Sequence, residues 1–364
     1  MLRPPEHRNT AGTTTIYTIH STLEVASPAD PSAERLASRP VKVIRFNQVQ
    51  PGLDPVEMSA RYRASIDMAA YAEEHGFDMV SLEEHHGAPD GWSPSPLITA
   101  GLVFGRCSRI GISLSALLVP LHDPLRIAED IAVLDLASGG RFVVIAGLGY
   151  RPEEYAAHGK SWADRGKLMD EALDVMLKAW TGEPFEYRGT TVQVTPRPVT
   201  QPHPMILVGG TSKPAARRAA RLGLPLSPAA HLPELEAYYY EQCAEHSTSG
   251  FCGMPAADLS LLFVHEDPDK GWAELGKYFM HEARTYADWQ TPDIRSAVHS
   301  HAKTAAELRA EGIYKVLTPE ECIAQGKEQG AGAIFTLHPL VGGMPLDEAW
   351  KCLTLFGEQV VPNL

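Results

Sequence analysis

Residues 78–87 read DMVSLEEHHG, and the interpretation of the whole chain depends on this stretch. It begins as a short apolar strand and ends in two carboxylates and two imidazoles. A helix-like segment from Ala60 to His75 precedes it, and Gly76 closes that segment. Catalytic groups at the C-terminal ends of strands are typical of α/β barrels, so we expect an active site directly after this strand.

Strand-like and helix-like segments alternate on both sides of this stretch. Apolar runs predict further strands at residues 41–46, 110–120, 142–146, 204–208, 259–265 and 332–337. Helical spacing predicts helices at residues 97–103, 125–138, 167–180, 214–222 and 346–360. Right-handed crossovers between such strands leave two α/β architectures, a (β/α)8 TIM barrel or an open doubly wound sheet. The glycine-rich dinucleotide fingerprint is missing after the first strand, which favours the barrel.

The predicted barrel occupies residues 41–364 and carries insertions. One insertion, Thr181 to Pro204, is rich in proline and contains a predicted hairpin at residues 185–192. Residues 1–40 form an N-terminal extension rich in Pro, Ser, Thr and Ala. We expect this extension to be poorly ordered or to pack on a neighbouring subunit.

Composition excludes several classes of protein. The 364 residues carry a formal net charge of -13, so nucleic-acid binding is not expected. No apolar run approaches the ~20 residues of a membrane-spanning helix, so we expect no membrane association. The five cysteines are irregularly spaced and form no CxxC motif. We therefore expect no disulfide framework and no metal site, and a reducing, cytoplasmic location.

The ionisable groups after the opening strand form the first candidate site. Neighbouring residues on a strand point to opposite faces, so His85 and His86 are not expected to bind one metal ion together. An imidazole at a barrel mouth can accept or donate a proton near neutral pH, which makes His85 a candidate catalyst. Glu84 or Glu83 would tune it. The alternative is a hydrogen-bonded histidine pair that only terminates the strand.

A second candidate site follows a later strand and opens a helix. Its small residues, Gly209, Gly210, Thr211 and Ser212, allow a ligand to approach the backbone N–H groups of the turn. A helix N-terminus favours an anion, and barrels often bind phosphate after their later strands. Arg165 could supply a further positive charge. The alternative is an ordinary capped turn without a ligand.

From Val41 onward, the chain resembles the bacterial luciferase-like flavin monooxygenase family. The resemblance rests on several ordered motifs rather than on one. They are AEEHGFD (72–78), EHH (84–86), PLHDPLRIAED (120–130), LDLASGGRF (134–142), TPEEC (318–322) and PNL (362–364). The resemblance implies a (β/α)8 barrel that binds a reduced flavin at the C-terminal ends of its strands.

The resemblance also implies roles for individual residues. His85 would be the acid/base beside the flavin, and Ser115–Ala116 would form a non-proline cis peptide under the isoalloxazine ring. Gly210 and Thr211 match the phosphate-binding turn, and Arg165 matches a phosphate-binding arginine.

The loop after residues 142–146 departs from the family pattern. Gly147 and Leu148 replace the reactive cysteine and the following arginine of luciferase, which removes one expected phosphate contact. We place Gly147 and Tyr150 of this loop at the cofactor.

We therefore predict a flavin-dependent monooxygenase that uses reduced FMN and O2 on a small organic substrate. A separate reductase would supply the reduced flavin, the chain would form a homodimer, and residues 286–312 would act as a lid. Three alternatives remain open. They are an F420-dependent hydride transferase, a catalytically inert flavin-binding relative and a metal-dependent barrel hydrolase that uses His85 and His86.

Overall fold

The computed structural model describes residues 39–290, 294, 296 and 298–364. Almost all of the predicted N-terminal extension lies outside these residues. So do residues 291–293, 295 and 297 of the predicted lid.

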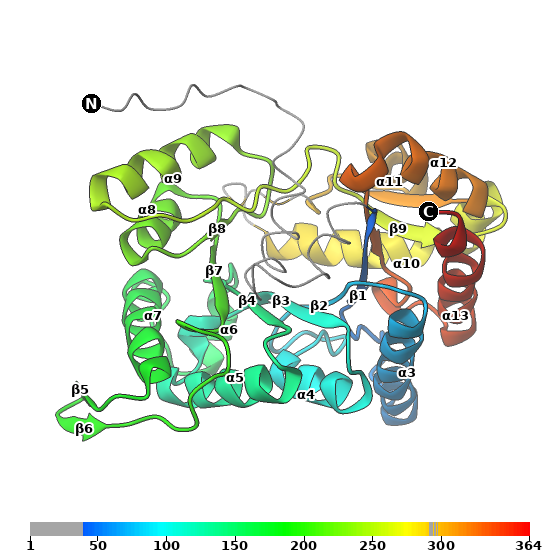
Figure 1. The fold of residues 1–364 in the computed structure, drawn as a ribbon. Helices are drawn as coiled ribbons and strands as arrows, with labels where there is room; N and C mark the ends of the chain where they lie inside the picture. Colours follow the sequence, from blue (N-terminus) through cyan, green and yellow to red (C-terminus); the bar gives the residue numbers. More distant parts are fainter. Residues whose placement is uncertain (1–38, 291–293, 295, 297) are drawn as a thin grey trace, which may run out of the picture.

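The core of the fold is one parallel sheet of nine strands (Figure 1). Its order is β10-β9-β11-β1-β2-β3-β4-β7-β8, and neighbouring strands in it run parallel. Helices surround the strands, so the predicted α/β barrel class is confirmed. The last three strands leave chain order, because β9 lies between β10 and β11. The strands are β1 (Val41–Phe46), β2 (Met79–Leu82), β3 (Gly111–Leu117), β4 (Phe142–Ala146), β7 (Met205–Gly209), β8 (Leu226–Ser227), β9 (Leu261–Val264), β10 (Tyr314–Leu317) and β11 (Ile334–Leu337).

Alternation along the strands separates the barrel interior from the helix layer. Ile44 and Phe46 of β1 belong to the large apolar core, whereas Val41 and Val43 belong to a separate small cluster with Met79 of β2. Both faces of β1 are buried, which explains its nearly continuous apolar sequence. The residues in step with Val41 and Val43 therefore carry their side chains into the barrel interior.

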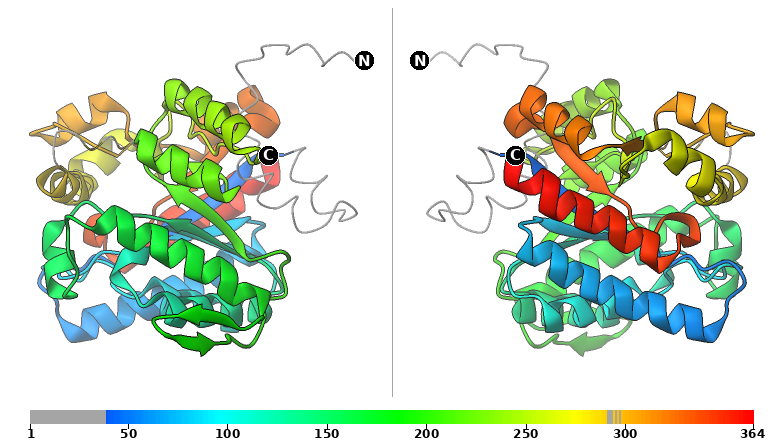
Figure 2. Two further views of the ribbon diagram at one scale, coloured as in Figure 1. Left: turned by 90° about the vertical axis from the view of Figure 1, so that its left-hand side faces the viewer. Right: turned by 90° about the vertical axis from the view of Figure 1, so that its right-hand side faces the viewer.

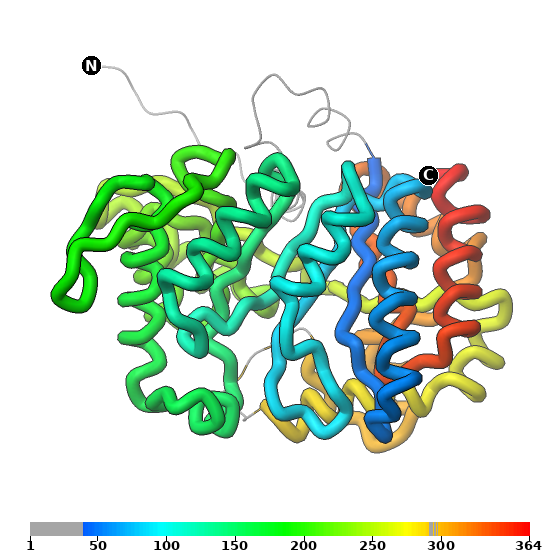
Figure 3. Tube along the Cα trace, turned by 90° about the horizontal axis from the view of Figure 1, so that it is seen from below, coloured from blue at the N-terminus to red at the C-terminus, as the bar shows by residue number. Residues whose placement is uncertain are grey.

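The helices form a ring around this sheet. The last helix, α13, contacts α3, and the two lie side by side in Figures 2 and 3. Capping aspartates begin three helices, since the side chains of Asp54, Asp123 and Asp267 accept backbone N–H groups of α3, α5 and α10. The helices are α3 (Pro55–Glu74), α4 (Pro96–Arg106), α5 (Pro124–Ser138), α6 (Pro152–Ala157), α7 (Arg165–Thr181), α8 (Lys213–Leu222), α9 (Pro233–His246), α10 (Pro268–Trp289), α11 (Ala305–Glu311), α12 (Pro319–Gln329) and α13 (Leu346–Leu355).

Short elements complete the chain. The predicted hairpin in the proline-rich insertion is present as β5 (Phe185–Tyr187) and β6 (Thr190–Val192). A single turn, η1 (Val119–Leu121), joins β3 to α5. Within the described part of the chain, no helix is both long and apolar enough to cross a membrane.

Candidate active site

The two histidines after β2 point in different directions. Val80 and Leu82 lie in the core beneath the helices, so Glu84 continues that face, while Glu83 and His85 continue the interior face. The contacts agree with this division, because His85 lies near Glu154 whereas His86 lies near Glu84. The two imidazoles therefore have different carboxylate partners.

His85 is held through both ring nitrogens. Its Nδ1 lies 3.3 Å from Glu154 Oε1, and its Nε2 lies 3.3 Å from Tyr150 Oη. Burial raises the pKa of Glu154, but the hydrogen bond and charge of His85 outweigh it and lower that pKa. An ionised carboxylate only accepts hydrogen bonds, so Nδ1 carries a proton and Nε2 can exchange one with Tyr150. This geometry suits an acid/base imidazole.

Aromatic rings enclose His85 on several sides. Their centroids lie between 4.8 and 6.3 Å from the imidazole centroid. The rings belong to Trp92, Tyr150, Tyr286 and Trp289. Because the histidine is only 6% exposed, proton transfer at Nε2 would take place in a nearly dry environment.

Glu154 corrects the predicted partner of His85. Glu84 was expected to tune this histidine, but the carboxylate within hydrogen-bond distance is Glu154, at the start of α6. Glu154 Oε1 also accepts the backbone N–H of His86 at 2.9 Å and Arg151 Nη1 at 3.2 Å. Its second oxygen, Oε2, is buried without a hydrogen-bond partner in the structure.

Glu84 instead joins two other histidines. Its Oε1 lies 2.9 Å from His86 Nε2 and 2.7 Å from His122 Nε2, and its Oε2 accepts the backbone N–H of Leu118. Burial alone would raise the pKa of Glu84. The hydrogen bonds from these three groups reverse that effect and lower the pKa to about 2.

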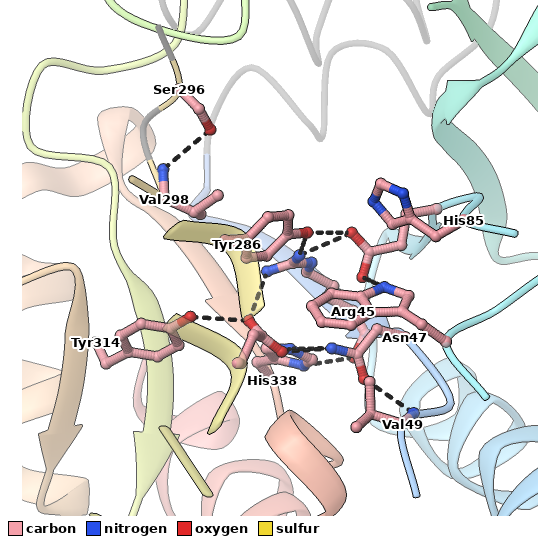
Figure 4. Close-up of polar contacts among 12 residues, drawn as sticks. Arg45, Asn47, Val49, His85, Tyr286, Ser296, Val298, Tyr314 and His338 are labelled. Carbon is pink, nitrogen blue, oxygen red and sulfur yellow. Dashed lines mark hydrogen bonds and ion pairs between the residues drawn. The ribbon is translucent and has the colours of Figure 1, made fainter. Parts of the chain in front are cut away.

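A buried network of charges lies inside the barrel, next to His85 (Figure 4). Arg45 Nη2 donates to Glu83 Oε2 at 2.8 Å and to Tyr286 Oη at 2.7 Å. Arg45 Nη1 lies 3.4 Å from Glu282 Oε1. Burial lowers the pKa of Arg45, but the charge of Glu83 and its other partners outweighs burial and raises it. Arg45 therefore stays charged and fixes Glu83.

Glu282 forms the second centre of the same network. It accepts hydrogen bonds from Asn47 and from Tyr314 Oη at 3.0 Å, and it lies 2.8 Å from His338 Nε2. Burial raises its pKa, yet the charges of His338 and Arg45 lower it to about 2. Because each charged group in this network has a partner, the network holds the polar side chains of the barrel interior in fixed positions.

The residues predicted to support the flavin lie near the ends of β3 and β4. The Ser115–Ala116 peptide bond is cis, as the resemblance implied. Ser115 is exposed although most of its strand is buried, so the cis bond borders a space open to solvent. Gly147 packs against this bond, because a Cβ there would lie 2.7 Å from Ala116 Cβ. Gly209 packs in a similar way, because a Cβ there would lie 2.9 Å from Ile145 Cγ2.

The predicted phosphate turn lies where β7 ends and α8 begins. Gly210 has φ +137, a conformation that side chains rarely adopt. Thr211 follows it. Ser212 is the N-cap residue of α8, but its side chain makes no hydrogen bond to the helix. These small residues leave the turn accessible to an anion at a helix N-terminus. The donors therefore fit a phosphate group.

Arg165 lies at the start of α7 and contacts its own loop. Its guanidinium lies 4.1 Å from the centroid of Trp162, and Nη1 donates to Trp162 O at 2.9 Å. Both of these contacts are with Trp162 and not with the predicted phosphate turn, so the phosphate-binding role of Arg165 stays a prediction.

Two cavities of the described part of the chain differ in their relation to this site. One of about 310 Å³ is lined by Trp289, whose indole also packs on His85, and by loops after β1 and β2. The larger, of about 560 Å³, lies between β9, α10 and α13 and contains none of the predicted site residues. The smaller cavity is therefore the one next to the candidate catalyst.

Comparison with known proteins agrees with this arrangement. A sequence model of the luciferase-like monooxygenases matches residues 41–332. An uncharacterized protein, y4vJ, of Sinorhizobium fredii is 29% identical over 59% of this chain and 63% of its own. The 4-hydroxyprotoasukamycin monooxygenase of Streptomyces nodosus subsp. asukaensis is 27% identical over 71% and 74%. The chain spans between 50% and 63% of the length of the first three curated relatives.

Solved structures share the fold. Monooxygenase RslO1 from Streptomyces bottropensis superposes with a TM-score of 0.68 at 24% identity, over 88% of this chain and 99% of its own. The oxygenating constituent of 3,6-diketocamphane monooxygenase from Pseudomonas putida, solved with FMN, gives 0.65 at 18% over 90% and 99%. An F420-dependent secondary alcohol dehydrogenase gives 0.59 at 18%, again over 90% and 99%.

Proposed function

Because the chain belongs to the luciferase-like monooxygenase family, we propose that it oxygenates a small organic substrate with reduced FMN and O2. The observation that carries this proposal is His85, held between Glu154 and Tyr150 in the barrel mouth. A separate reductase supplies the reduced flavin. When bound, the flavin carries the redox chemistry, and the protein contributes binding, orientation and a proton.

Two elements support flavin binding at this mouth. The cis bond at Ser115–Ala116 borders an open space and offers a backbone surface for the ring system. The turn at residues 209–212 offers backbone N–H groups and the positive end of the α8 dipole for the phosphate. The side chains of Thr211 and Ser212 would add hydroxyl donors.

His85 manages the proton in this proposal. Glu154 fixes Nδ1–H, so the reactive atom is Nε2, which accepts a hydrogen bond from the hydroxyl of Tyr150. Trp92, Tyr286 and Trp289 exclude water around the imidazole, which would keep proton transfer at Nε2 away from solvent.

The second candidate is an F420-dependent hydride transferase that uses no oxygen. It is supported by a shared fold with an F420-dependent secondary alcohol dehydrogenase. Leu148 also supports it, since the arginine expected there for FMN phosphate is missing. A catalytically inert flavin-binding relative is the remaining alternative.

Cofactor titration followed by oxygen uptake tests these functions. Fluorescence titrations with FMN, FAD and F420 identify the tightest binder, and oxygen uptake is then measured with its reduced form. We expect FMN to bind most tightly and to support oxygen consumption coupled to substrate oxidation. Tight F420 binding with no oxygen uptake would replace the monooxygenase with the hydride transferase.

The variant His85→Ala separates an enzyme from an inert relative. We expect it to keep flavin affinity and to lose roughly 10²–10⁴-fold in turnover, the usual contribution of a positioned acid/base. Unchanged turnover in this variant would show that His85 is not the catalyst.

A further inference from the structure

A cluster on the helix side of β2 does not take part in the proposed flavin chemistry. It consists of Glu84 and His86 from the end of β2 and His122 from the segment after η1, and their ligand atoms lie within 4.8 Å of one another. We propose that Glu84, His86 and His122 bind one divalent transition-metal ion. This site is separate from His85, because strand alternation places the two histidines on opposite faces.

The three donor atoms converge on one point. Both imidazoles direct Nε2 at the same carboxylate oxygen, Glu84 Oε1, at 2.9 and 2.7 Å. A tetrahedral ion with bonds of about 2.0–2.1 Å separates neighbouring ligand atoms by about 3.3 Å. Each oxygen–nitrogen pair therefore has to separate by only about half an ångström to take such an ion in place of its shared proton. The two imidazole nitrogens already lie within 4.8 Å of each other.

The carboxylate is already oriented as a metal ligand requires. Its other oxygen, Oε2, accepts the backbone N–H of Leu118, which fixes the carboxylate plane and leaves Oε1 as a single ligand atom. Hydrogen bonds of this kind from the surroundings orient ligands and raise the affinity of metal sites. The carboxylate is fully buried and the two histidine side chains are 15% and 26% exposed, so an ion can enter from the histidine side.

The ligand set indicates which ions fit. Two imidazoles and one carboxylate suit Zn²⁺, Co²⁺ or Ni²⁺, whereas Mg²⁺ and Ca²⁺ prefer oxygen donors alone. Three protein ligands leave a fourth position for water. His158 lies beside the cluster, since its ring centroid is 4.4 Å from that of His86 and its Nδ1 lies 2.8 Å from Glu154 O. The ion would tie the end of β2 to the segment before α5.

The competing interpretation is a set of hydrogen bonds without any ion. Metal binding to tag-free, chelator-treated full-length protein distinguishes the two. We expect equilibrium dialysis against Zn²⁺, with metal analysis, to give one ion per chain. We also expect Co²⁺ to give visible absorption bands of a four-coordinate site, which zinc then displaces.

Variants locate the ion. We expect His122→Asn and Glu84→Gln each to weaken Zn²⁺ binding by more than about 100-fold, since removing a ligand exceeds the 10–100-fold cost of removing a supporting group. His231→Ala is the matched control, because His231 is exposed and its Nδ1 contacts only a backbone carbonyl, Pro255 O. It should bind zinc as the wild type does. Circular dichroism and thermal unfolding verify that each variant folds.

Two results would overturn the proposal. One is a wild type that binds less than one zinc per chain at micromolar concentration and gives no visible cobalt bands. The other is a folded His122→Asn protein that binds zinc as tightly as the wild type. If His122→Asn does not fold, the cobalt spectrum of the wild type decides alone.

Discussion

Glu154 is the residue on which the orientation of His85 depends. The pair is joined at 3.3 Å, and the second carboxylate oxygen is buried with no hydrogen-bond partner among the described residues. We expect Glu154→Gln to lower kcat by about 10–100-fold with little change in KM, since the amide can present the wrong partner to Nδ1–H. Steady-state oxygen uptake measures both constants.

A neighbouring glutamate provides the control for this variant. Glu153 precedes Glu154 on α6 and is exposed, so Glu153→Gln makes the same chemical change away from the imidazole. Equal kcat values in the two variants would mean that Glu154 does not position His85. A fall in kcat for Glu154→Asp that is smaller than for Glu154→Gln would support a role for the charge.

Of the two residues in the His85–Glu154 contact, sequence patterns predicted only His85. The opening strand and its ionisable end indicate His85, because period-two alternation separates it from His86. Glu154 lies 69 residues away on a short helix, and nothing in its local sequence marks it as a partner. The signal that would indicate it is tertiary, since the loop after β4 has to cross the barrel mouth to reach β2. Glu83 and Glu84 were nearer in sequence, but their strand positions turn them to Arg45 and His122.

Glu282 makes stability depend on pH. The pKa of Glu282 is lowered to about 2 from its ordinary value of 4.5. The ion pairs of Glu282 therefore contribute their full stability above pH 4.5, and this contribution is lost as the pH falls towards 2. At pH 7 we expect Glu282→Gln to cost roughly 3–5 kcal/mol, because Arg45 and His338 lose their buried partner. This cost should shrink below pH 4.5. Urea denaturation at pH 3 to 7 measures it.

Glu274 lies on the same helix and supplies the control. It is exposed, so Glu274→Gln should change stability by less than about 0.5 kcal/mol at every pH. A Glu282→Gln cost that stays constant down to pH 3 would contradict the assignment of the titration to Glu282.

At the scale of elements, the residue that follows β4, Gly147, packs against β3. A Cβ there would lie 2.7 Å from Ala116 Cβ, so Gly147→Ala has to push the loop away from the cis bond. We expect a loss of about 1–3 kcal/mol in stability, the usual cost of overpacking, together with weaker FMN binding. Thermal unfolding and fluorescence titration measure the two effects.

Gly105 is the matched control for this substitution. It lies in α4, and a Cβ there meets nothing within 4 Å. Gly105→Ala should leave FMN affinity unchanged and can raise stability by up to about 1 kcal/mol, because alanine favours a helix. FMN binding that is unaffected in Gly147→Ala would remove Gly147 from the cofactor platform.

The sequence predicts the strands well where both faces of a strand are buried. Strands such as β1 and β4 have continuous apolar sequences, and their predicted bounds agree with the structure. Helix α9 is not indicated by its sequence, because its buried residues form a narrow stripe of Leu235, Tyr239 and Cys243. The two-residue strand β8 is too short to give a pattern. These elements depend on tertiary packing.

At the scale of the whole molecule, α4 and α5 expose an apolar surface. They contact each other, and Ile98 and Leu102 on α4 and Val133 and Leu136 on α5 are between 42% and 68% exposed. We propose that this surface joins two copies of the chain in the expected homodimer, since a two-fold axis pairs such a patch with itself. We expect Ile98→Glu to shift the protein from dimer to monomer in sedimentation experiments.

Val199 tests whether any exposed apolar residue would have the same effect. It is 53% exposed in the proline-rich insertion, away from both helices. Val199→Glu should leave the dimer intact. A wild-type protein that sediments as a monomer at micromolar concentration would refute the interface.

The pairing of β1 with β11 also affects how the protein is made. Val41 in β1 pairs in register with Ile334 in β11, so one edge of β1 has no partner until β11 has been synthesised. A ribosome releases the N-terminal strand first, and an unpaired strand edge invites association with other chains. During translation, β1 therefore keeps an unpaired edge for most of the time that synthesis takes. A chaperone that covers this edge would raise the yield of folded protein.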